Sequence, residues 1–258
     1  MRAEIEHNVI LSIAGSVAKG LLVPKQPPYF GVAVDAGDVV ACAIRTPPHK
    51  LVVSGGSGAA MQALAQDVFA LAPELPALNG PEPAAGAFAA AWSELAGRPA
   101  LPGKRQRLYV AYAVTDGLRE TPGALRRAER DDRALVLQWA AEFAREAVPD
   151  EPFDREEVVG RYYLTQGLYL WDDAGAATML VASGKTLNGA RVGFVYTPPA
   201  RRRNGYATAA VAALTARLLA DGNQYCCLYT DLANPTSNSI YQQVGYQRLR
   251  DINDYLFT

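Results

Sequence analysis

The sequence contains few of the residues that build metal centres and disulfide frameworks. Its 258 residues include three cysteines and two histidines. Three is an odd number for a disulfide framework, and Cys226 and Cys227 are neighbours in a strand-like run, so their side chains point to opposite faces. With only His7 and His49 available, we expect neither a metal site nor a serine–histidine triad. This use of cysteine is typical of a reducing cytoplasm.

The sequence also has little net charge and no long apolar run. The formal net charge is −1, so the chain has no general attraction to nucleic acid or to anionic membranes. Its one basic cluster, Arg201 to Arg203, is too local for a nucleic-acid footprint. No apolar run approaches the roughly 20 residues that span a bilayer. Acidic residues before the short apolar stretch near the start argue against a signal peptide. We expect a cytoplasmic protein that binds neither nucleic acid nor membrane.

Residues 191–207 combine a strand, a tight turn and the start of a helix. The run from Arg191 to Tyr196 alternates as a strand does, and Pro198 ends it because proline has no N–H to donate. Asn204 and Gly205 follow the arginines in a turn. Free N–H groups and the positive end of a helix dipole meet there, which predicts a pyrophosphate site rather than a solvated basic turn. Helical spacing follows at Ala207, Ala210, Val211, Leu214 and Leu218.

Two motifs in this part of the chain resemble those of a known family. Residues 202–207, RRNGYA, resemble the acyl-CoA signature Gln/Arg-x-x-Gly-x-Gly/Ala of the GNAT N-acetyltransferase superfamily. In that family the signature lies between the fourth strand and the third helix. A second block, Asn-x-x-Ala/Ser-x-x-x-Tyr-x-x-x-Gly-Phe/Tyr, keeps its spacing here. Its positions are Asn234, Ser237, Tyr241, Gly245 and Tyr246. The resemblance covers roughly residues 130–258.

The resemblance implies how acetyl-CoA would be bound. Backbone N–H groups of the turn would face the pyrophosphate, and the side chain of Arg202 would point toward it. Main-chain groups of the fourth strand would pair with the pantetheine arm, and Asn234 would cap a helix and contact the same arm. The cofactor-binding residues implied are Phe194, Val195, Tyr196, Arg202, Arg203, Asn204, Gly205, Tyr206, Ala207 and Asn234.

The resemblance also places Tyr241 beside the sulfur of CoA, where a phenol can protonate the departing thiolate. The alternative is that Tyr241 is only a core residue. The general base is open, because residues 191–196 contain no carboxylate. Asp231, Glu142 and Glu157 are candidates, although each also suits a capping or solvated position. An acceptor groove could be lined by aromatic residues that are otherwise core: Trp171, Tyr169 and Tyr163.

Periodicity and turn residues give the order of the elements. Alternation predicts hairpins at 29–34 with 39–44 and at 168–171 with 176–182, and strands at 51–53, 108–114, 191–196, 224–230 and 247–257. Helical spacing predicts helices at about 61–72, 84–95, 131–149, 154–162, 207–222 and 235–245.

The elements repeat in order, which favours a tandem arrangement. We expect an α+β GNAT fold with a mixed, mostly antiparallel sheet flanked by helices. Residues 1–115 would form a degenerate GNAT-like domain, 116–130 a linker and 131–258 the catalytic domain. The glycine-rich loop at 54–58 lacks arginines, so a structural loop is favoured over a second phosphate site.

We therefore expect an N-acetyltransferase that moves an acetyl group from acetyl-CoA to a primary amine. The acceptor would be a small molecule or a peptide, and attack would be direct, since no cysteine adjoins a histidine that could activate it. The protein would be a monomer or a homodimer. The alternative is a non-catalytic acyl-CoA-binding or regulatory protein. A magnesium-dependent phosphate loop is disfavoured, because no Lys-Ser/Thr follows the glycine.

Overall fold

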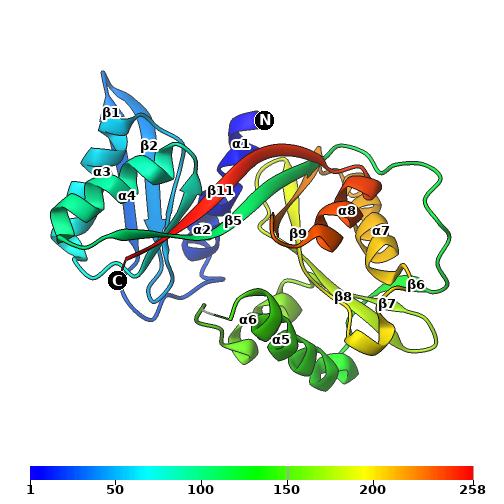
Figure 1. Ribbon diagram of the computed structural model, residues 1–258. Helices are drawn as coiled ribbons and strands as arrows, with labels where there is room; N and C mark the ends of the chain where they lie inside the picture. Colours follow the sequence, from blue (N-terminus) through cyan, green and yellow to red (C-terminus); the bar gives the residue numbers. More distant parts are fainter. Residues whose placement is uncertain (150, 258) are drawn as a thin grey trace. The chain divides into compact units, whose positions relative to one another are not determined.

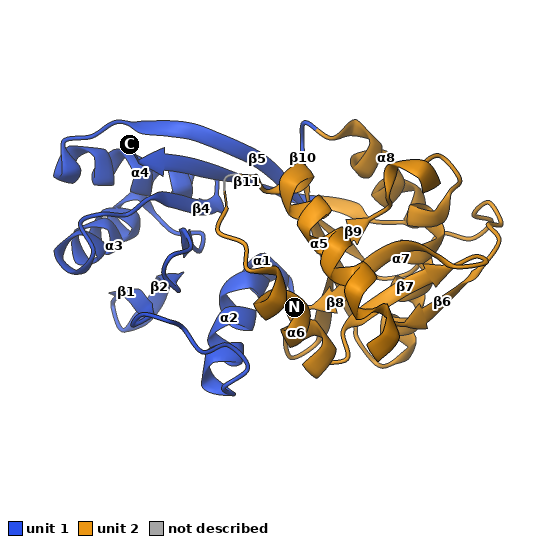
Figure 2. Cartoon of the chain, turned by 90° about the horizontal axis from the view of Figure 1, so that it is seen from below, with its two compact units in different colours: residues 1–108, 231–233, 249–258 blue, residues 109–230, 234–248 orange. Residues whose placement is uncertain are grey.

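The chain forms two compact units, each built from strands and helices (Figure 2). A computed structural model describes residues 1–149 and 151–257. Neither unit is continuous in sequence. Unit 1 comprises residues 1–108, 231–233 and those from 249 onward, and unit 2 comprises residues 109–230 and 234–248.

Unit 1 has strand order β1-β2-β3-β4-β11-β5. The pair β3–β4 is parallel, and the pairs β1–β2, β2–β3 and β4–β11 are antiparallel. Helices α3 and α4 enclose its core, where Trp92 contacts the rings of Phe69, Phe88 and Phe257. Its elements are α1 (Arg2–Glu6), α2 (Asn8–Ala18), β1 (Tyr29–Asp35), β2 (Asp38–Arg45), β3 (Leu51–Val53), α3 (Gly58–Leu71), β4 (Ala77–Pro81), α4 (Ala84–Ala96), most of β5 (Ala100–Ala111) and most of β11 (Gln247–Phe257).

Unit 2 has strand order β10-β9-β8-β7-β6, in which only β9–β10 is parallel. One core lies under α7 and α8, and another lies under α5 and α6, on the other side of β7–β9 (Figure 1). Its elements are β6 (Ala124–Arg127), the 3-10 turn η1 (Arg130–Asp132), α5 (Arg133–Ala147), α6 (Arg155–Leu164), β7 (Leu168–Asp172), β8 (Ala176–Ser183), β9 (Gly189–Tyr196), η2 (Pro199–Arg201), α7 (Tyr206–Ala220), β10 (Tyr225–Asp231) and α8 (Pro235–Val244).

The α+β class, the mixed and mostly antiparallel pairing and the repeated element order are confirmed. Each unit contains a strand, a loop, a helix and a second strand parallel to the first: β3-α3-β4 in unit 1 and β9-α7-β10 in unit 2. Both expected hairpins are present, as β1–β2 and β7–β8.

The strands of the structure differ from the expected ones at three places. Residues 77–81 form β4, which the sequence did not suggest, because Gly80 and Pro81 disfavour strands. Residues 124–127, inside the expected linker, form β6 and pair with β7. The strand expected at 108–114 begins at Ala100 and ends at Ala111.

The compact units divide the chain differently from the expected domains. The first long segment of unit 1 ends at residue 108, and residues from 249 onward belong to unit 1 rather than to the C-terminal half. The cause is β11, whose residues 252–256 pair with β4. None of the helices in the described ranges is long and apolar enough to cross a bilayer.

Candidate functional site

Strand β9 has one edge that its neighbour leaves open. It pairs in parallel with β10 over three residues, from Gly189 opposite Tyr225 to Arg191 opposite Cys227. Beyond Arg191, none of the described strands continues this pairing on the β10 side of residues 193–196. Unpaired main-chain groups at a strand edge can bind an extended ligand as a sheet binds an added strand.

A bulge at Phe194 accompanies this opening. The register between β8 and β9 shifts between the pairs Val181–Gly193 and Met179–Tyr196, so β9 contains one extra residue there. Phe194 has a φ of 56°, which is rare for a residue with a side chain. The bulge turns the main chain locally at the position where the resemblance implies that the thioester is held.

The side chains of the three implied strand residues divide between the two faces of the sheet. Phe194 packs among aromatic rings under α5 and α6, with its ring centroid 4.3 Å from that of Phe143. Tyr196 lies on the same side and donates to Glu142 Oε2 at 2.8 Å. Val195 packs against the core under α7 and α8. All three side chains therefore take part in packing, and the main chain of these residues is the part that lies at the open edge.

The turn after β9 presents the N-terminus of α7 without a side-chain cap. Arg203 and Gly205 have φ of 66° and 85°, and no side chain in the described part of the chain caps this helix. Asn204 braces the turn by donating to the carbonyls of Arg201 and Arg202, each at 3.1 Å. The first N–H groups of a 15-residue helix are thus left for solvent or an anion.

The side chain of Arg202 is paired within the protein. It donates to both carboxylate oxygens of Glu146 on α5, at 3.0 and 2.8 Å, and to the Thr197 carbonyl at 2.9 Å. The resemblance implied that the Arg202 side chain points toward the anion site, whereas here it is paired with Glu146. Both partners are nearly half exposed, so the ion pair contributes at most about 1 kcal/mol. A pyrophosphate group can therefore compete with Glu146 for this guanidinium.

Tyr206 and Ala207, the first two residues of α7, have different roles. Tyr206 is buried, and its hydroxyl donates to Asp173 Oδ2 at 2.5 Å, which ties the first turn of α7 to the β7–β8 hairpin. That hydrogen bond, with a smaller contribution from burial, raises the pKa of the Tyr206 phenol. Ala207 is half-buried in the same turn. Its small side chain keeps the approach to the helix N-terminus open.

Helix α8 carries the second motif as expected. Asn234 caps it, accepting at Oδ1 from the Ser237 N–H at 3.0 Å, and Gly245 ends it with a φ of 112°. Tyr241 is buried, with its ring centroid 6.2 Å from that of Tyr246. Burial raises the pKa of Tyr241 to about 12, against a smaller opposing effect of a hydrogen bond with Ser237. At neutral pH this phenol therefore carries the proton that a general acid must give.

The three carboxylates considered as bases differ in their surroundings. Glu142 accepts from Gln138 and Tyr196, and these hydrogen bonds lower its pKa, which makes it a weaker base. Asp231 accepts from the Ala233 N–H at 2.8 Å, the turn-capping role that was its alternative. Glu157 lies exposed in the first turn of α6. The assignment of a base stays open.

The aromatic residues proposed for an acceptor groove are engaged in the fold. Trp171 donates from Nε1 to the Pro122 carbonyl at 2.9 Å, and Tyr169 is buried in the core under α7. Tyr163 donates to the Glu129 carbonyl at 3.0 Å and lines a small cavity of about 200 Å³ with its neighbour Tyr162. Of the three, Tyr163 is thus the one that lines this cavity.

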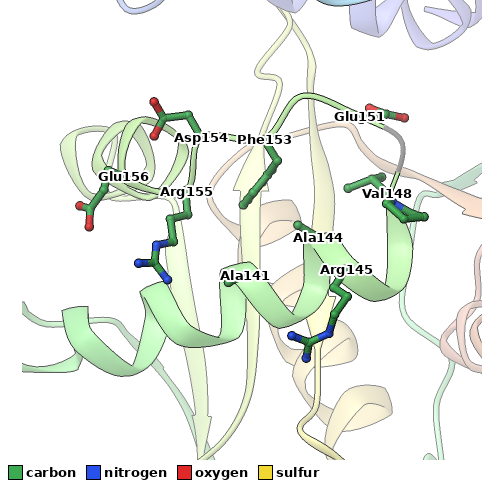
Figure 3. A pocket seen from close by; sticks show the side chains of 10 residues that line it. Ala141, Ala144, Arg145, Val148, Glu151, Phe153, Asp154, Arg155 and Glu156 are labelled. Atoms are coloured by element: carbon green, nitrogen blue, oxygen red, sulfur yellow. The ribbon is translucent and has the colours of Figure 1, made fainter.

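A larger cavity, of about 780 Å³, lies elsewhere in unit 2 and was missed from the sequence (Figure 3). One wall is formed by the C-terminal half of α5 with residues 148 and 149, and the other by residues 151 and 153–156. Its position depends on how these two segments pack, so no motif marks it. It is lined by Ala141, Ala144, Arg145, Val148, Pro149, Glu151, Phe153, Asp154, Arg155 and Glu156.

Within residues 1–149 and 151–257, no three His, Cys, Asp or Glu side chains are grouped so that they could hold a metal ion. Cys226 and Cys227 are buried, and burial raises the pKa of each thiol to about 12. Neither thiol is therefore poised to act as a nucleophile.

Comparison with known proteins agrees with this reading of the fold. Residues 167–255 match the family model described as FR47-like protein, which is GNAT-related. None of the curated proteins matches the sequence.

The solved structures that resemble this chain include GNAT proteins matched along most of their length. A GCN5-related N-acetyltransferase from Sphaerobacter thermophilus is 17% identical, and the similarity covers 99% of this chain and 92% of that one with a TM-score of 0.59. For the enzyme of the same description from Kribbella flavida, the values are 16%, 95%, 94% and 0.59. A tandem GNAT protein from the clavulanic acid biosynthesis pathway is 14% identical, with 95% and 86% covered and a TM-score of 0.54.

These likenesses establish the fold. The chain has the GNAT fold in its tandem form, and its C-terminal part carries an FR47-like, GNAT-related domain.

Proposed function

We propose that this protein is an N-acetyltransferase that uses acetyl-CoA and acts in unit 2. The observation that carries the proposal is the open edge of β9, which ends at the uncapped N-terminus of α7. An extended pantetheine arm suits the edge, and a pyrophosphate group suits the helix N-terminus. Acetyl-CoA contains both groups in one molecule.

The reaction would be a direct transfer. The lone pair of a primary amine attacks the thioester carbon, the C–N bond forms and the C–S bond breaks. The amine loses one proton, to water or to a base not yet identified, and the sulfur leaves as a thiolate. Tyr241 gives its proton to that sulfur, which restores neutrality on the leaving group. No acyl-enzyme is required.

Tyr241 suits this role because of its environment. Its pKa of about 12 keeps it protonated at physiological pH, and burial excludes the water that would otherwise compete for the proton. A phenolate in this site would be strongly disfavoured, so the proton must be replaced quickly from solvent or from the amine. Ser237, whose hydrogen bond with Tyr241 lowers that pKa, provides a contact through which the proton can return.

A non-catalytic acyl-CoA-binding protein is the second candidate. Strand β9 carries no carboxylate, and Glu142 is already held by Tyr196 and Gln138. Both candidates bind acetyl-CoA, but only the enzyme releases free thiol when an amine is supplied.

The first experiment tests the anion site with a matched pair of variants at Ala207. Glutamate in the first turn of a helix favours the helix but repels a pyrophosphate, whereas glutamine has the same size and no charge. Calorimetric titration of acetyl-CoA should show binding to wild type and a loss of affinity of about 100-fold or more in Ala207→Glu. Ala207→Gln should bind acetyl-CoA at least about tenfold more tightly than Ala207→Glu.

Two outcomes would contradict the proposal. Equal affinities of Ala207→Glu and Ala207→Gln would remove the pyrophosphate from this helix. A folded wild-type protein that does not bind acetyl-CoA would overturn the function itself. If binding is seen, a panel of primary amines with thiol detection decides between the enzyme and the binding protein.

A further inference from the structure

The β1 end of the unit 1 sheet is covered differently on its two faces. The strands run in the order β1, β2, β3 from this end (Figure 1). On one face, α3 packs against β1 and β2, and Ala33, Ala41 and Ala43 are buried in the core that it shares with them. On the other face, α2 packs against β2 and β3. The layer of helices on that second face therefore lies over β2 and β3.

Along β1 the side chains of the second face are exposed. Tyr29, on the first face, donates to Asp67 Oδ2 of α3 at 2.7 Å. Because side chains alternate along a strand, Phe30, Val32 and Val34 point to the opposite face. Their exposed fractions are 51%, 60% and 58%. These three apolar side chains have a place on a sheet face but no layer of unit 1 that buries them.

The exposed side chains continue onto β2. Val39, which lies opposite Val34 in the hairpin, is 64% exposed, and its neighbour Val40 is 39% exposed. We call the five side chains of this hairpin the β1–β2 strip: Phe30, Val32, Val34, Val39 and Val40. A contiguous apolar surface of this kind marks an interaction site, whereas single exposed apolar side chains need no explanation.

The charges near the strip indicate its partner. Residues 29–34 carry no charge, and the carboxylates of Asp35 and Asp38 lie exposed at the turn end of the hairpin. An acidic end disfavours an anionic membrane surface. It also disfavours a partner strip in the parallel direction, which would bring like charges together. Two copies in opposite directions keep the acidic ends apart, and a twofold axis produces that arrangement.

The size of the strip sets the expected affinity. A Val or Phe side chain has on the order of 100 Å² of accessible surface, so the strip exposes roughly 250 Å² of apolar side chain in each copy. Two strips packed together bury about 500 Å² of it, which belongs to the small interfaces below about 1,200 Å² in total. A dimer held in this way has a micromolar dissociation constant.

We propose that the β1–β2 strip is the contact through which two copies of this chain form a dimer, with the strips packed face to face and running in opposite directions. Each hairpin then supplies the layer that the other lacks beside α2, and the apolar side chains form a core between two sheets. The dimer is independent of the proposed acetyltransferase function.

Sedimentation velocity of the full chain, over concentrations from micromolar to near-millimolar, tests the dimer. Wild type should pass from monomer to dimer in this range. Val32→Lys on β1 and Val39→Lys on β2 should each raise the dissociation constant at least about tenfold, because each change places a charge in the apolar contact of both copies. Both side chains are exposed in the single chain, so urea unfolding should show little change in stability.

Leu71→Lys is the matched control, because Leu71 is an equally exposed apolar residue of unit 1, at 69%, and lies at the end of α3 outside the strip. It should dimerise as wild type does. A wild type that stays monomeric throughout the range would overturn the inference and leave the strip to a different partner. Equal effects of all three variants would also overturn it. A loss in Val32→Lys without one in Val39→Lys would replace face-to-face packing with pairing of the two β1 edges.

Discussion

The two units build the same junction of strand, loop and helix, but they complete it differently. In unit 1 the loop after β3 is closed by its own residues: Ser57 caps α3 by accepting from the Ala60 N–H at 3.2 Å. Ser54 accepts from the Cys42 N–H at 2.9 Å and donates to the Gly55 carbonyl at 2.7 Å. The favoured expectation, a structural loop, fits these bonds.

In unit 2 the corresponding helix, α7, is capped by none of the side chains that the structure describes, and its N-cap residue, Gly205, has none to contribute. A Cβ atom at Gly56 of unit 1 would lie 2.8 Å from Met61 Cε and 2.9 Å from Ala41 Cβ, so the loop is packed against its own core. The comparison teaches that topology alone does not make an anion site. The site requires helix N–H groups that the protein itself leaves unused.

The helix that follows the parallel strand pair differs in chemistry between the two units. In unit 1, α4 follows β4 and consists mostly of alanine around Phe88 and Trp92. In unit 2, α8 follows β10, begins with a capping asparagine and buries the phenol of Tyr241. Within this pair, only the helix of unit 2 carries a candidate proton donor.

The largest expected effect comes from removing that donor. Tyr241→Phe should lower thiol release by about 100-fold or more while leaving acetyl-CoA affinity within about threefold, because it removes a proton and little volume. The change makes α8 resemble α4, which also lacks a phenol. Thiol detection with a reactive amine, alongside calorimetry, measures both quantities.

Tyr246→Phe is the control for this experiment, since it removes a neighbouring buried phenol whose hydroxyl is 2.7 Å from Thr215 Oγ1. Tyr246→Phe should lower the free energy of unfolding and leave the rate of thiol release nearly unchanged. Similar losses of turnover in both variants would show that Tyr241 acts through packing and not as an acid.

A smaller effect is expected when the two glycines at the helix starts are replaced by alanine. Gly205→Ala should destabilise the protein by about 1 kcal/mol, because a φ of 85° is unfavourable for a residue with a Cβ. A Cβ there would also lie 2.9 Å from Thr121 Oγ1. Gly58→Ala, where a Cβ meets open space, should be neutral or stabilising by up to about 1 kcal/mol. Urea unfolding measures both, and a loss at Gly58 equal to that at Gly205 would contradict the contrast.

The smallest effect concerns the closed loop of unit 1. Ser57→Ala should cost about 1 kcal/mol or less of unfolding free energy, because α3 loses its cap. Acetyl-CoA affinity should not change. A measurable loss of affinity in this variant would place a second anion site in unit 1 and remove the difference between the units.

Local patterns in the sequence predicted the elements well where one pattern dominated. The β1–β2 and β7–β8 hairpins follow from alternation, and α8 follows from Asn234, Pro235 and Gly245. Strand β4 was missed because its pairing with β11 outweighs a glycine and a proline. Pairing of this kind joins residues about 175 positions apart, as between Asn79 and Asp254, and no local pattern reports it.

The candidate site was predictable to a similar extent. The positive φ of Gly205 and the cap at Asn234 agree with residue type, and they place the motifs as expected. The partner of Arg202 was not predictable, because Glu146 lies 56 positions earlier on another helix. The cavity at Phe153 was not predictable either, since its walls are separate segments whose packing creates it.

The placement of β11 has a consequence for synthesis on the ribosome. Unit 1 includes β11, whose residues are translated after almost all of unit 2. Unit 2 can therefore be complete while unit 1 still lacks a strand beside β4, whose edge is then unpaired. In a nascent chain this edge of β4 therefore stays unpaired until the last strand of the protein has been made. For the same reason, no single cut in the gene separates two whole units.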